Sequence, residues 1–325
     1  MHGVVVESEF QPAWWLPGPH AQTLGAQARR GPVLPLDWEE FTLADGDFIE
    51  LGWTGPEDGP IAVLIHGLGG SFQSPHIRGL AKAMQAAGWR VCLFHFRGCA
   101  LRPNRSLTTY HNGWTADLKA VFAALAERFP DRRRVAVGIS LGGNALLKLL
   151  GETGAQGEAV PIDAAAAISV ALELRPCVDR LDSGFSKLYQ AILLRRLKRR
   201  LSERRALIAA RLDWDRIVSA RRFPAFDEAF TAPAHGFENA EDYYARASSR
   251  GQLHAVGVPT LILVAADDPF LAQAALPRAE DLSPAIRAEV SRGGGHVGFV
   301  CGPPHRPVYW LEQRIVRWLQ AIEAP

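Results

Sequence analysis

The fold of this chain is decided by residues 135–144, which read Val135-Ala136-Val137-Gly138-Ile139-Ser140-Leu141-Gly142-Gly143-Asn144. The segment places G-x-S-x-G directly after an apolar run and before a helical pattern. A strand that turns sharply into a helix holds its middle residue in a strained, exposed conformation, and small neighbours let the two limbs pass closely. The pattern therefore predicts Ser140 as a nucleophile near the positive end of a helix. On its own, it also fits an ordinary strand-to-helix turn.

Short apolar runs alternate with helical patterns along the chain, which predicts an α/β fold with a mainly parallel, twisted sheet. Several runs are continuously apolar, as expected where helices cover both faces of the sheet. We expect one domain over residues 1–325. The predicted strands are Glu40–Leu43, Phe48–Trp53, Ile61–Ile65, Arg90–Phe96, Arg134–Ile139, Ala164–Val170, Pro259–Ala265 and Ile286–Ser291, and the predicted helices are Ile77–Ala87, Trp114–Phe129, Gly142–Leu150 and Pro307–Ala321.

One segment, from about residue 172 to residue 250, lacks the strand pattern and is helical and rich in arginine. Between Lys187 and Arg222 it holds twelve Lys or Arg against three Asp or Glu. We interpret it as a basic, helical cap inserted between two strands, over the carboxyl edge of the sheet. Leu188, Ile192, Leu197 and Leu201 recur at helical spacing, with Arg195, Arg196, Lys198, Arg199 and Arg200 between them. The simpler interpretation is a solvated basic face, and the alternative is peripheral contact with a membrane or an anionic substrate.

Two further segments carry the groups that would activate Ser140. A serine hydroxyl needs a base that removes its proton and an acid that orients the base. In the α/β-hydrolase fold these partners follow in the order Ser, Asp or Glu, and His. Asp267-Asp268-Pro269 comes after one late predicted strand, and Gly293-Gly294-Gly295-His296 comes after the next. We therefore predict His296 as the general base and Asp268, which directly precedes the proline, as the acid, with Asp267 as the alternative.

An acyl-transfer site also needs donors for the developing oxyanion. The N–H of Leu141, directly after the nucleophile, is one candidate, and the N–H of Leu68 is the other. Leu68 lies in the loop His66-Gly67-Leu68-Gly69-Gly70-Ser71, which follows an early predicted strand. A dinucleotide or phosphate loop is disfavoured, because Phe72 occupies the last position of G-x-G-x-x-G and no lysine follows in register. We expect no cofactor, and no metal site, because the spacing of four histidines matches no ligand pattern: His66, His76, His95 and His111.

The composition describes a globular chain with a sizeable core, since 48% of its 325 residues are apolar and 22% are charged. A formal net charge of +2 gives no argument for nucleic acid binding. No apolar run approaches the roughly 18–20 residues that span a bilayer, and the N-terminus lacks the pattern of a secretory signal. The four cysteines show no paired spacing, which favours free thiols in a reducing compartment. We therefore expect a cytoplasmic protein.

The chain resembles the YheT-type family of α/β-hydrolases, which includes plant embryogenesis-associated proteins and animal α/β-hydrolase-domain lipases. The resemblance implies Ser140, Asp268 and His296 as the catalytic triad and hydrolysis of carboxylic esters, with some members acting on acylglycerols or phospholipids. The motifs that carry it are Pro19-His20-Ala21-Gln22-Thr23, His66-Gly67-Leu68-Gly69-Gly70-Ser71, Phe96-Arg97-Gly98-Cys99, Asn104-Arg105, Tyr110-His111-Asn112-Gly113, Ser140-Leu141-Gly142-Gly143-Asn144, Phe230-Thr231-Ala232-Pro233, Asp267-Asp268-Pro269 and Gly294-Gly295-His296-Val297-Gly298-Phe299.

The leading hypothesis is a serine esterase or lipase that acts on a small-molecule ester or lipid through an acyl-enzyme intermediate. An acyltransferase or thioesterase would use the same residues. A binding protein that keeps the hydrolase fold without catalysis is the alternative from another class. Acyl-chain length and oligomeric state stay open at this level.

Overall fold

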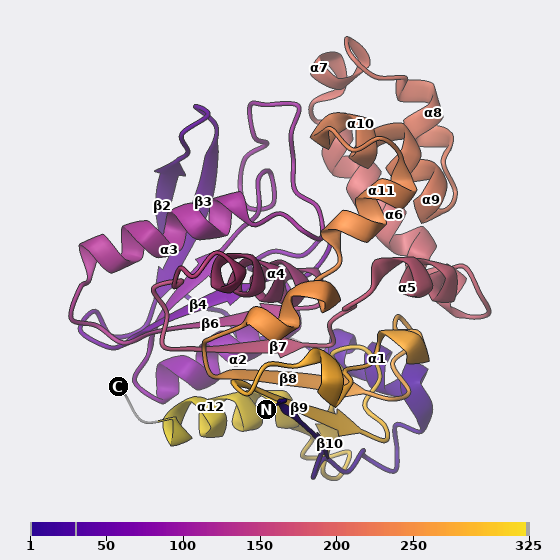
Figure 1. Cartoon of the computed structure of the whole chain (residues 1–325). Helices are drawn as coiled ribbons and strands as arrows, with labels where there is room; N and C mark the ends of the chain where they lie inside the picture. Colours follow the sequence, from indigo (N-terminus) through magenta and orange to yellow (C-terminus); the bar gives the residue numbers. More distant parts are fainter. Residues whose placement is uncertain (1, 30, 323–325) are drawn as a thin grey trace.

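A nine-stranded sheet forms the centre of the molecule (Figure 1). The computed structural model describes residues 2–29 and 31–322. Neighbouring strands follow the order β1-β9-β8-β7-β6-β4-β5-β3-β2, with parallel pairing from β1 through β5 and antiparallel pairing of β3 with β5 and β2. The strands are β1 (Val4–Glu7), β2 (Asp37–Thr42), β3 (Phe48–Thr54), β4 (Ile61–Ile65), β5 (Arg90–Phe94), β6 (Arg134–Ile139), β7 (Ala164–Ile168), β8 (Thr260–Ala265) and β9 (Ile286–Ser291).

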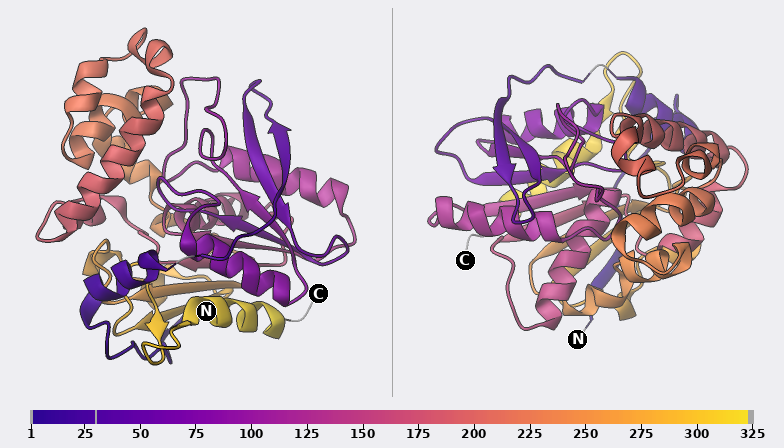
Figure 2. Two further views of the ribbon diagram at one scale, coloured as in Figure 1. Left: turned by 180° about the vertical axis from the view of Figure 1, so that it is seen from behind. Right: turned by 90° about the horizontal axis from the view of Figure 1, so that it is seen from above.

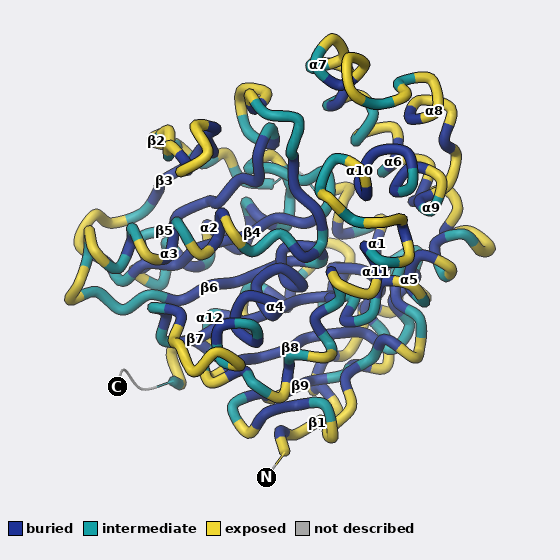
Figure 3. The backbone as a smooth tube through the Cα atoms, turned by 45° about the horizontal axis from the view of Figure 1, so that its top comes forward, coloured by how far each residue is buried: buried dark blue, intermediate teal, exposed yellow. Residues whose placement is uncertain are grey.

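Helices cover both faces of this sheet, which confirms the predicted fold class (Figures 1 and 2). On one face, α2 (Pro75–Ala86) and α12 (Trp310–Ala321) share a buried apolar cluster with the strands. On the other, α3 (Ala116–Arg128) and α4 (Leu141–Ala155) do the same. The central strands β4, β7 and β8 are buried at every position, as Figure 3 shows. Burial on both faces explains why their sequences are continuously apolar.

All the strands and helices predicted above are present, with ends shifted by a few residues, but β1 and α1 (Gly18–Ala28) were not predicted. Strand β1 is a short edge strand with mostly exposed residues, so it shows no apolar alternation. Helix α1 buries Gln22 and Thr23, which are polar. Its sequence therefore lacks the apolar period by which a packed helix is recognised. A two-stranded sheet of β10 (Val300–Cys301) and β11 (Val308–Tyr309) completes the strands of the described residues.

The segment between β7 and β8 is helical and forms the upper part of the molecule in Figure 1. Its helices bury a cluster of their own, separate from the two clusters that line the sheet. Its elements are α5 (Leu174–Leu181), α6 (Ser186–Ser202), α7 (Arg205–Ala209), α8 (Trp214–Ser219), α9 (Phe223–Phe226), a π-helical turn (Asp227–Thr231), α10 (Ala232–His235), α11 (Ala240–Ala247) and a 3₁₀ turn (Arg250–Ala255).

The buried face of α6 differs from the face expected from its leucine spacing. Leu188 and Ile192 are exposed, whereas Tyr189, Leu194 and Leu201 are buried. The helix thus buries only part of the predicted stripe, because it packs against α5, α7 and α9 rather than against a single partner helix. Each described helix is too short or too polar to cross a membrane.

Candidate active site

Ser140 occupies the turn between β6 and α4, with φ of 53° and ψ of −117°. This is a strained backbone conformation for a residue with a side chain. Glycine is required around it on steric grounds. A Cβ on Gly138 would lie 2.5 Å from the carbonyl oxygen of Gly142, and a Cβ on Gly142 would lie 2.5 Å from that of His66. Because the neighbours are backbone atoms, the G-x-S-x-G pattern is a packing requirement of this turn.

The three residues predicted as a triad are brought together in the structure. Ser140 Oγ lies 3.1 Å from Nε2 of His296, and Nδ1 of His296 lies 2.9 Å from Oδ2 and 3.1 Å from Oδ1 of Asp268. Asp268 is buried, with 2% of its surface exposed, and its Oδ1 also accepts a hydrogen bond from the N–H of Phe270 at 2.8 Å. The Phe270 ring stacks on the imidazole at a centroid distance of 3.9 Å and an angle of 1°. Asp268 therefore holds the imidazole at its Nδ1 edge, and Phe270 holds it on one face.

The neighbouring carboxylate, Asp267, points to a different partner. Its Oδ1 accepts a hydrogen bond from the N–H of Gly295 at 2.9 Å, so it anchors the backbone of the loop that carries His296. Burial raises the pKa of this carboxyl group above its ordinary value. Of the two acids that the sequence left open, Asp268 is the one in contact with His296.

Helix α1 supports the same loop, a role that pattern reasoning missed. Thr23 Oγ1 accepts a hydrogen bond from the N–H of His296 at 2.9 Å and donates one to the carbonyl of Pro19 at 2.7 Å. Gln22 bonds the backbone of Val300 twice, accepting from its N–H at 2.8 Å and donating to its carbonyl at 3.1 Å. The sequence pointed to this segment only through the Pro19–Thr23 motif, to which we assigned no catalytic role.

The predicted oxyanion donors lie beside Ser140. The backbone of the His66–Ser71 loop passes so close that a Cβ on Gly67 would lie 3.2 Å from Cβ of Ser140. Within the described residues, neither the N–H of Leu68 nor that of Leu141 donates to another protein group. Both residues line a cavity together with Ser140.

Buried groups fix the shape of this loop. Nδ1 of His66 lies 2.7 Å from the carbonyl of Gly67, and its Nε2 lies 3.3 Å from the N–H of Phe96. Burial lowers the pKa of His66 to about 3, so the ring is neutral and donates through Nδ1 while Nε2 accepts. Tyr110 Oη accepts a hydrogen bond from the N–H of Gly69 at 2.9 Å. His66 thus has a structural place in the loop.

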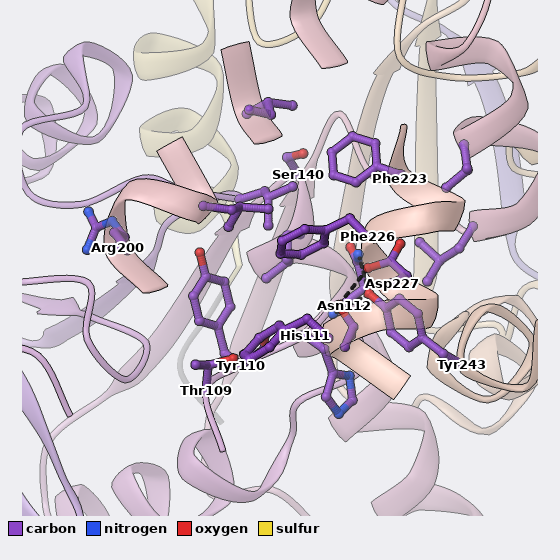
Figure 4. A pocket seen from close by; sticks show the side chains of 18 of the residues that line it. Thr109, Tyr110, His111, Asn112, Ser140, Arg200, Phe223, Phe226, Asp227 and Tyr243 are labelled. Carbon is purple, nitrogen blue, oxygen red and sulfur yellow. Dashed lines mark hydrogen bonds between the residues drawn. The ribbon is translucent and has the colours of Figure 1, made fainter. Parts of the chain in front are cut away.

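Two cavities meet at Ser140. The first cavity, drawn in Figure 4, fills about 1180 Å³ including its open mouth and extends beneath the helical segment. Its walls are largely apolar, with Leu193, Leu197 and Phe226 among them. The second, of about 920 Å³ with its mouth, opens between α1 and α6 past Gly67. An ester placed at Ser140 would have separate space for each of its two halves.

The first cavity also contains a buried acid that the sequence did not single out. Asp227, in the π-helical turn, accepts hydrogen bonds from Thr231 Oγ1 at 2.6 Å and Tyr244 Oη at 2.7 Å. Burial raises its pKa to about 6. Because π-helical turns interrupt the regular hydrogen bonding of helices, they occur preferentially at functional sites.

Neither thiols nor metal ligands compete with the serine in this region. Burial raises the thiol pKa of Cys92, Cys99, Cys177 and Cys301, so these groups stay protonated at neutral pH. In the described part of the chain, no three His, Cys, Asp or Glu side chains are grouped so that they could hold a metal ion.

Comparison with known proteins places the chain in a family. The family model described as alpha/beta hydrolase fold matches residues 60–303. YheT of Escherichia coli (strain K12), which bears the name of an esterase, is 37% identical over 319 residues, covering 96% of this chain and 93% of that protein. Phospholipase ABHD3 of Mus musculus is 28% identical over 333 residues, covering 99% of this chain and 80% of the relative.

Among solved structures, the Pyrococcus furiosus esterase Pf2001 is similar over 98% of this chain and 97% of its own, with a TM-score of 0.57 and 16% identity. At that identity the likeness concerns the fold. The sheet order, the Ser140 turn and the match to YheT over almost its whole length agree with one another. The chain belongs to the YheT-type family of α/β-hydrolases.

Proposed function

We propose that the chain is a serine hydrolase that cleaves carboxylic esters through an acyl-enzyme intermediate. The observation that carries the proposal is the continuous contact from Ser140 Oγ to His296 Nε2 and from His296 Nδ1 to Asp268. A carboxylate beside Nδ1 favours the tautomer with the proton there. Nε2 is then free to accept the proton of the serine hydroxyl.

The reaction follows from this arrangement. Ser140 Oγ attacks the ester carbonyl while His296 takes its proton, and Asp268 stabilises the imidazolium that forms. The N–H groups of Leu141 and Leu68 bind the negative charge on the carbonyl oxygen. His296 then protonates the departing alcohol. A water molecule, activated in the same way, hydrolyses the acyl-enzyme and releases the acid.

The two cavities support a division of the substrate. The first cavity takes the acyl chain, and the opening between α1 and α6 takes the alcohol and later the water. We propose a small-molecule ester or a lipid as substrate, in line with the names of the relatives YheT and ABHD3. We also propose that the helices from α5 to α11 form a cap within a single domain of residues 1–325.

An exposed stripe on α6 supports a proposal about membranes. Phe185, Leu188 and Ile192 are exposed, and the stripe continues through Arg195 and Arg199 at the same helical spacing. We propose that this stripe makes peripheral contact with anionic lipid, the apolar side chains entering the interface and the arginines meeting the head groups. Sedimentation with phosphatidylglycerol vesicles should remove more protein from solution than phosphatidylcholine vesicles do. Equal binding to both would refute the contact.

We propose a cytoplasmic location on the basis of the four free thiols. Fractionation of cells that produce the protein should recover it with cytoplasmic markers and, after washing at high salt, should leave none with the membranes.

The test of the main proposal is replacement of Ser140 by alanine. Turnover of p-nitrophenyl esters should fall by at least about 10³-fold, and a fluorophosphonate probe should label the parent protein at Ser140 but not the variant. Ser219→Ala serves as the control, because Ser219 is exposed on α8 and outside both cavities. Undiminished hydrolysis in Ser140→Ala would refute the assignment. Absence of both labelling and turnover in the parent protein would favour a binding protein.

A further inference from the structure

Arg200 connects the helical segment to the loop that carries Leu68 by a hydrogen bond. It lies near the end of α6 and is half-buried. Its Nη1 donates to the carbonyl of Gly98 at 2.6 Å and its Nη2 to the carbonyl of Gly70 at 3.4 Å. A solvated basic face does not describe this side chain, since its donors reach the loops that carry Gly70 and Gly98.

Other hydrogen bonds that shape the loop come from groups outside the helical segment. Tyr110 holds the N–H of Gly69, and His66 holds the carbonyl of Gly67. On its outer side the loop meets α6 directly, because a Cβ on Gly69 would lie 3.7 Å from Cβ of Arg196. The position of α6 therefore bears on the direction of the Leu68 N–H.

The same helix forms a wall of the first cavity. Leu193, Leu197 and Leu201 line it, and Arg200 lies between the last two. A ligand chain packed on these leucines would contact the helix whose Arg200 also donates to the carbonyls of Gly70 and Gly98. Helix α6 thus connects the cavity wall formed by these leucines to the loop that carries Leu68.

We propose that Arg200 is a positioning residue that couples occupation of the acyl cavity to the geometry of the oxyanion loop. The inference rests on the proposed ester hydrolysis and adds a preference for esters with a long acyl chain. Binding energy from a chain remote from the reacting carbonyl then raises kcat rather than only lowering KM. Small displacements of an oxyanion donor have large effects on rate, so the coupling is measurable.

The test compares kcat and KM for p-nitrophenyl acetate and p-nitrophenyl octanoate in the full chain. The variants are Arg200→Met, which removes both donated bonds, and Arg200→Lys, which keeps the charge and one donor. Arg211→Met is the control, because Arg211 is exposed between α7 and α8 and lies outside both cavities.

In the parent protein, kcat should be higher for the octanoate. Arg200→Met should lower kcat for the octanoate by about 10- to 100-fold, with KM changed less than about threefold and the acetate affected much less. Arg200→Lys should recover part of the loss, and Arg211→Met should behave as the parent does. Phosphonylation of Ser140 by a long-chain fluorophosphonate should slow in parallel, whereas a short-chain probe should react almost as before.

Several results would overturn the coupling. An effect of Arg200→Met on KM alone would limit Arg200 to a contact with the ligand, and equal losses for both esters would make it a general support of the fold. A parent kcat that does not depend on chain length would overturn it as well. If Arg200→Met does not fold, as judged by circular dichroism, Arg200→Lys decides by the same comparison. These outcomes differ from failure of the proposed function, which would appear as hydrolysis that survives Ser140→Ala.

Discussion

Replacing Asp268 by asparagine should lower kcat about 10⁴-fold, whereas the same change at Asp267 should lower it less than about tenfold. The two residues are adjacent and the two substitutions are chemically identical, so each variant controls for the other. The expected difference arises from the partners of the two side chains.

In the Asp268→Asn variant, the new side-chain amide would have a fixed orientation. The N–H of Phe270 donates to Oδ1 of Asp268 at 2.8 Å, so the amide oxygen would take that position. The NH₂ group would then occupy the position of Oδ2, which lies 2.9 Å from Nδ1 of His296. A donor there favours the imidazole tautomer with its proton on Nε2, which cannot accept the proton of Ser140. A loss of 10⁴-fold corresponds to about 5.5 kcal/mol in the activation free energy.

At Asp267 the partner is the N–H of Gly295, at 2.9 Å from Oδ1. An amide oxygen accepts this hydrogen bond as a carboxylate does, and burial already disfavours the charge that the substitution removes. The loop that carries His296 should therefore keep its position.

The assay is steady-state hydrolysis of a p-nitrophenyl ester, with thermal denaturation to show that both variants are folded. A loss at Asp267 as large as that at Asp268 would refute the reasoning. It would mean that the loop position, rather than the tautomer of His296, limits the reaction. A reversed order would transfer the role of the acid to Asp267.

Three further predictions concern stability. Gly142→Ala should lower the free energy of unfolding by about 1–3 kcal/mol in urea titrations, because its Cβ would lie 2.5 Å from the carbonyl of His66; an unchanged midpoint would contradict the steric argument. Thr23→Val should cost about 1–3 kcal/mol by leaving the buried N–H of His296 without an acceptor, whereas Thr23→Ser should retain most of the stability. Asp227 has a folded pKa of about 6, raised by burial from 3.8, so stability present below pH 4 is lost as the pH rises to 6. Asp227→Asn should remove about 3 kcal/mol of that pH dependence. The measurement compares the free energy of unfolding of parent and variant at pH 4, 5, 6 and 7. If both proteins show the same dependence of this free energy on pH, Asp227 is not buried as a neutral acid.

The sequence was informative where local sterics or chain order decide the outcome. The turn at Ser140 was predictable because close backbone contacts, of Gly138 with the start of α4 and of Gly142 with the end of β4, allow only glycine at both positions. The central strands were predictable because helices on both faces require continuous apolar runs. The nearness of Ser140, Asp268 and His296 was predictable because parallel topology brings the carboxyl ends of strands to one edge, whereas their order came from the known order in the α/β-hydrolase fold.

Tertiary structure decided what depends on contacts between distant segments. Helix α1 holds the backbone of His296 through Thr23, which lies 273 residues earlier in the chain. Because the residues that α1 buries include polar ones, its sequence shows no apolar periodicity. The face that α6 buries was set by its neighbours, since leucine spacing fits more than one orientation of a helix packed on several partners.

The same limit applied to the two acids. Asp267 and Asp268 have the same chemistry and adjoining positions, so the sequence by itself determined that an acid follows β8 but favoured one of the pair only by its place before a proline. Which carboxylate touches the imidazole depends on the directions of two side chains relative to a loop from another strand. Arg200 shows the contrast most clearly, because its charge was evident in the sequence while its bonds to Gly70 and Gly98 exist only after the chain has folded.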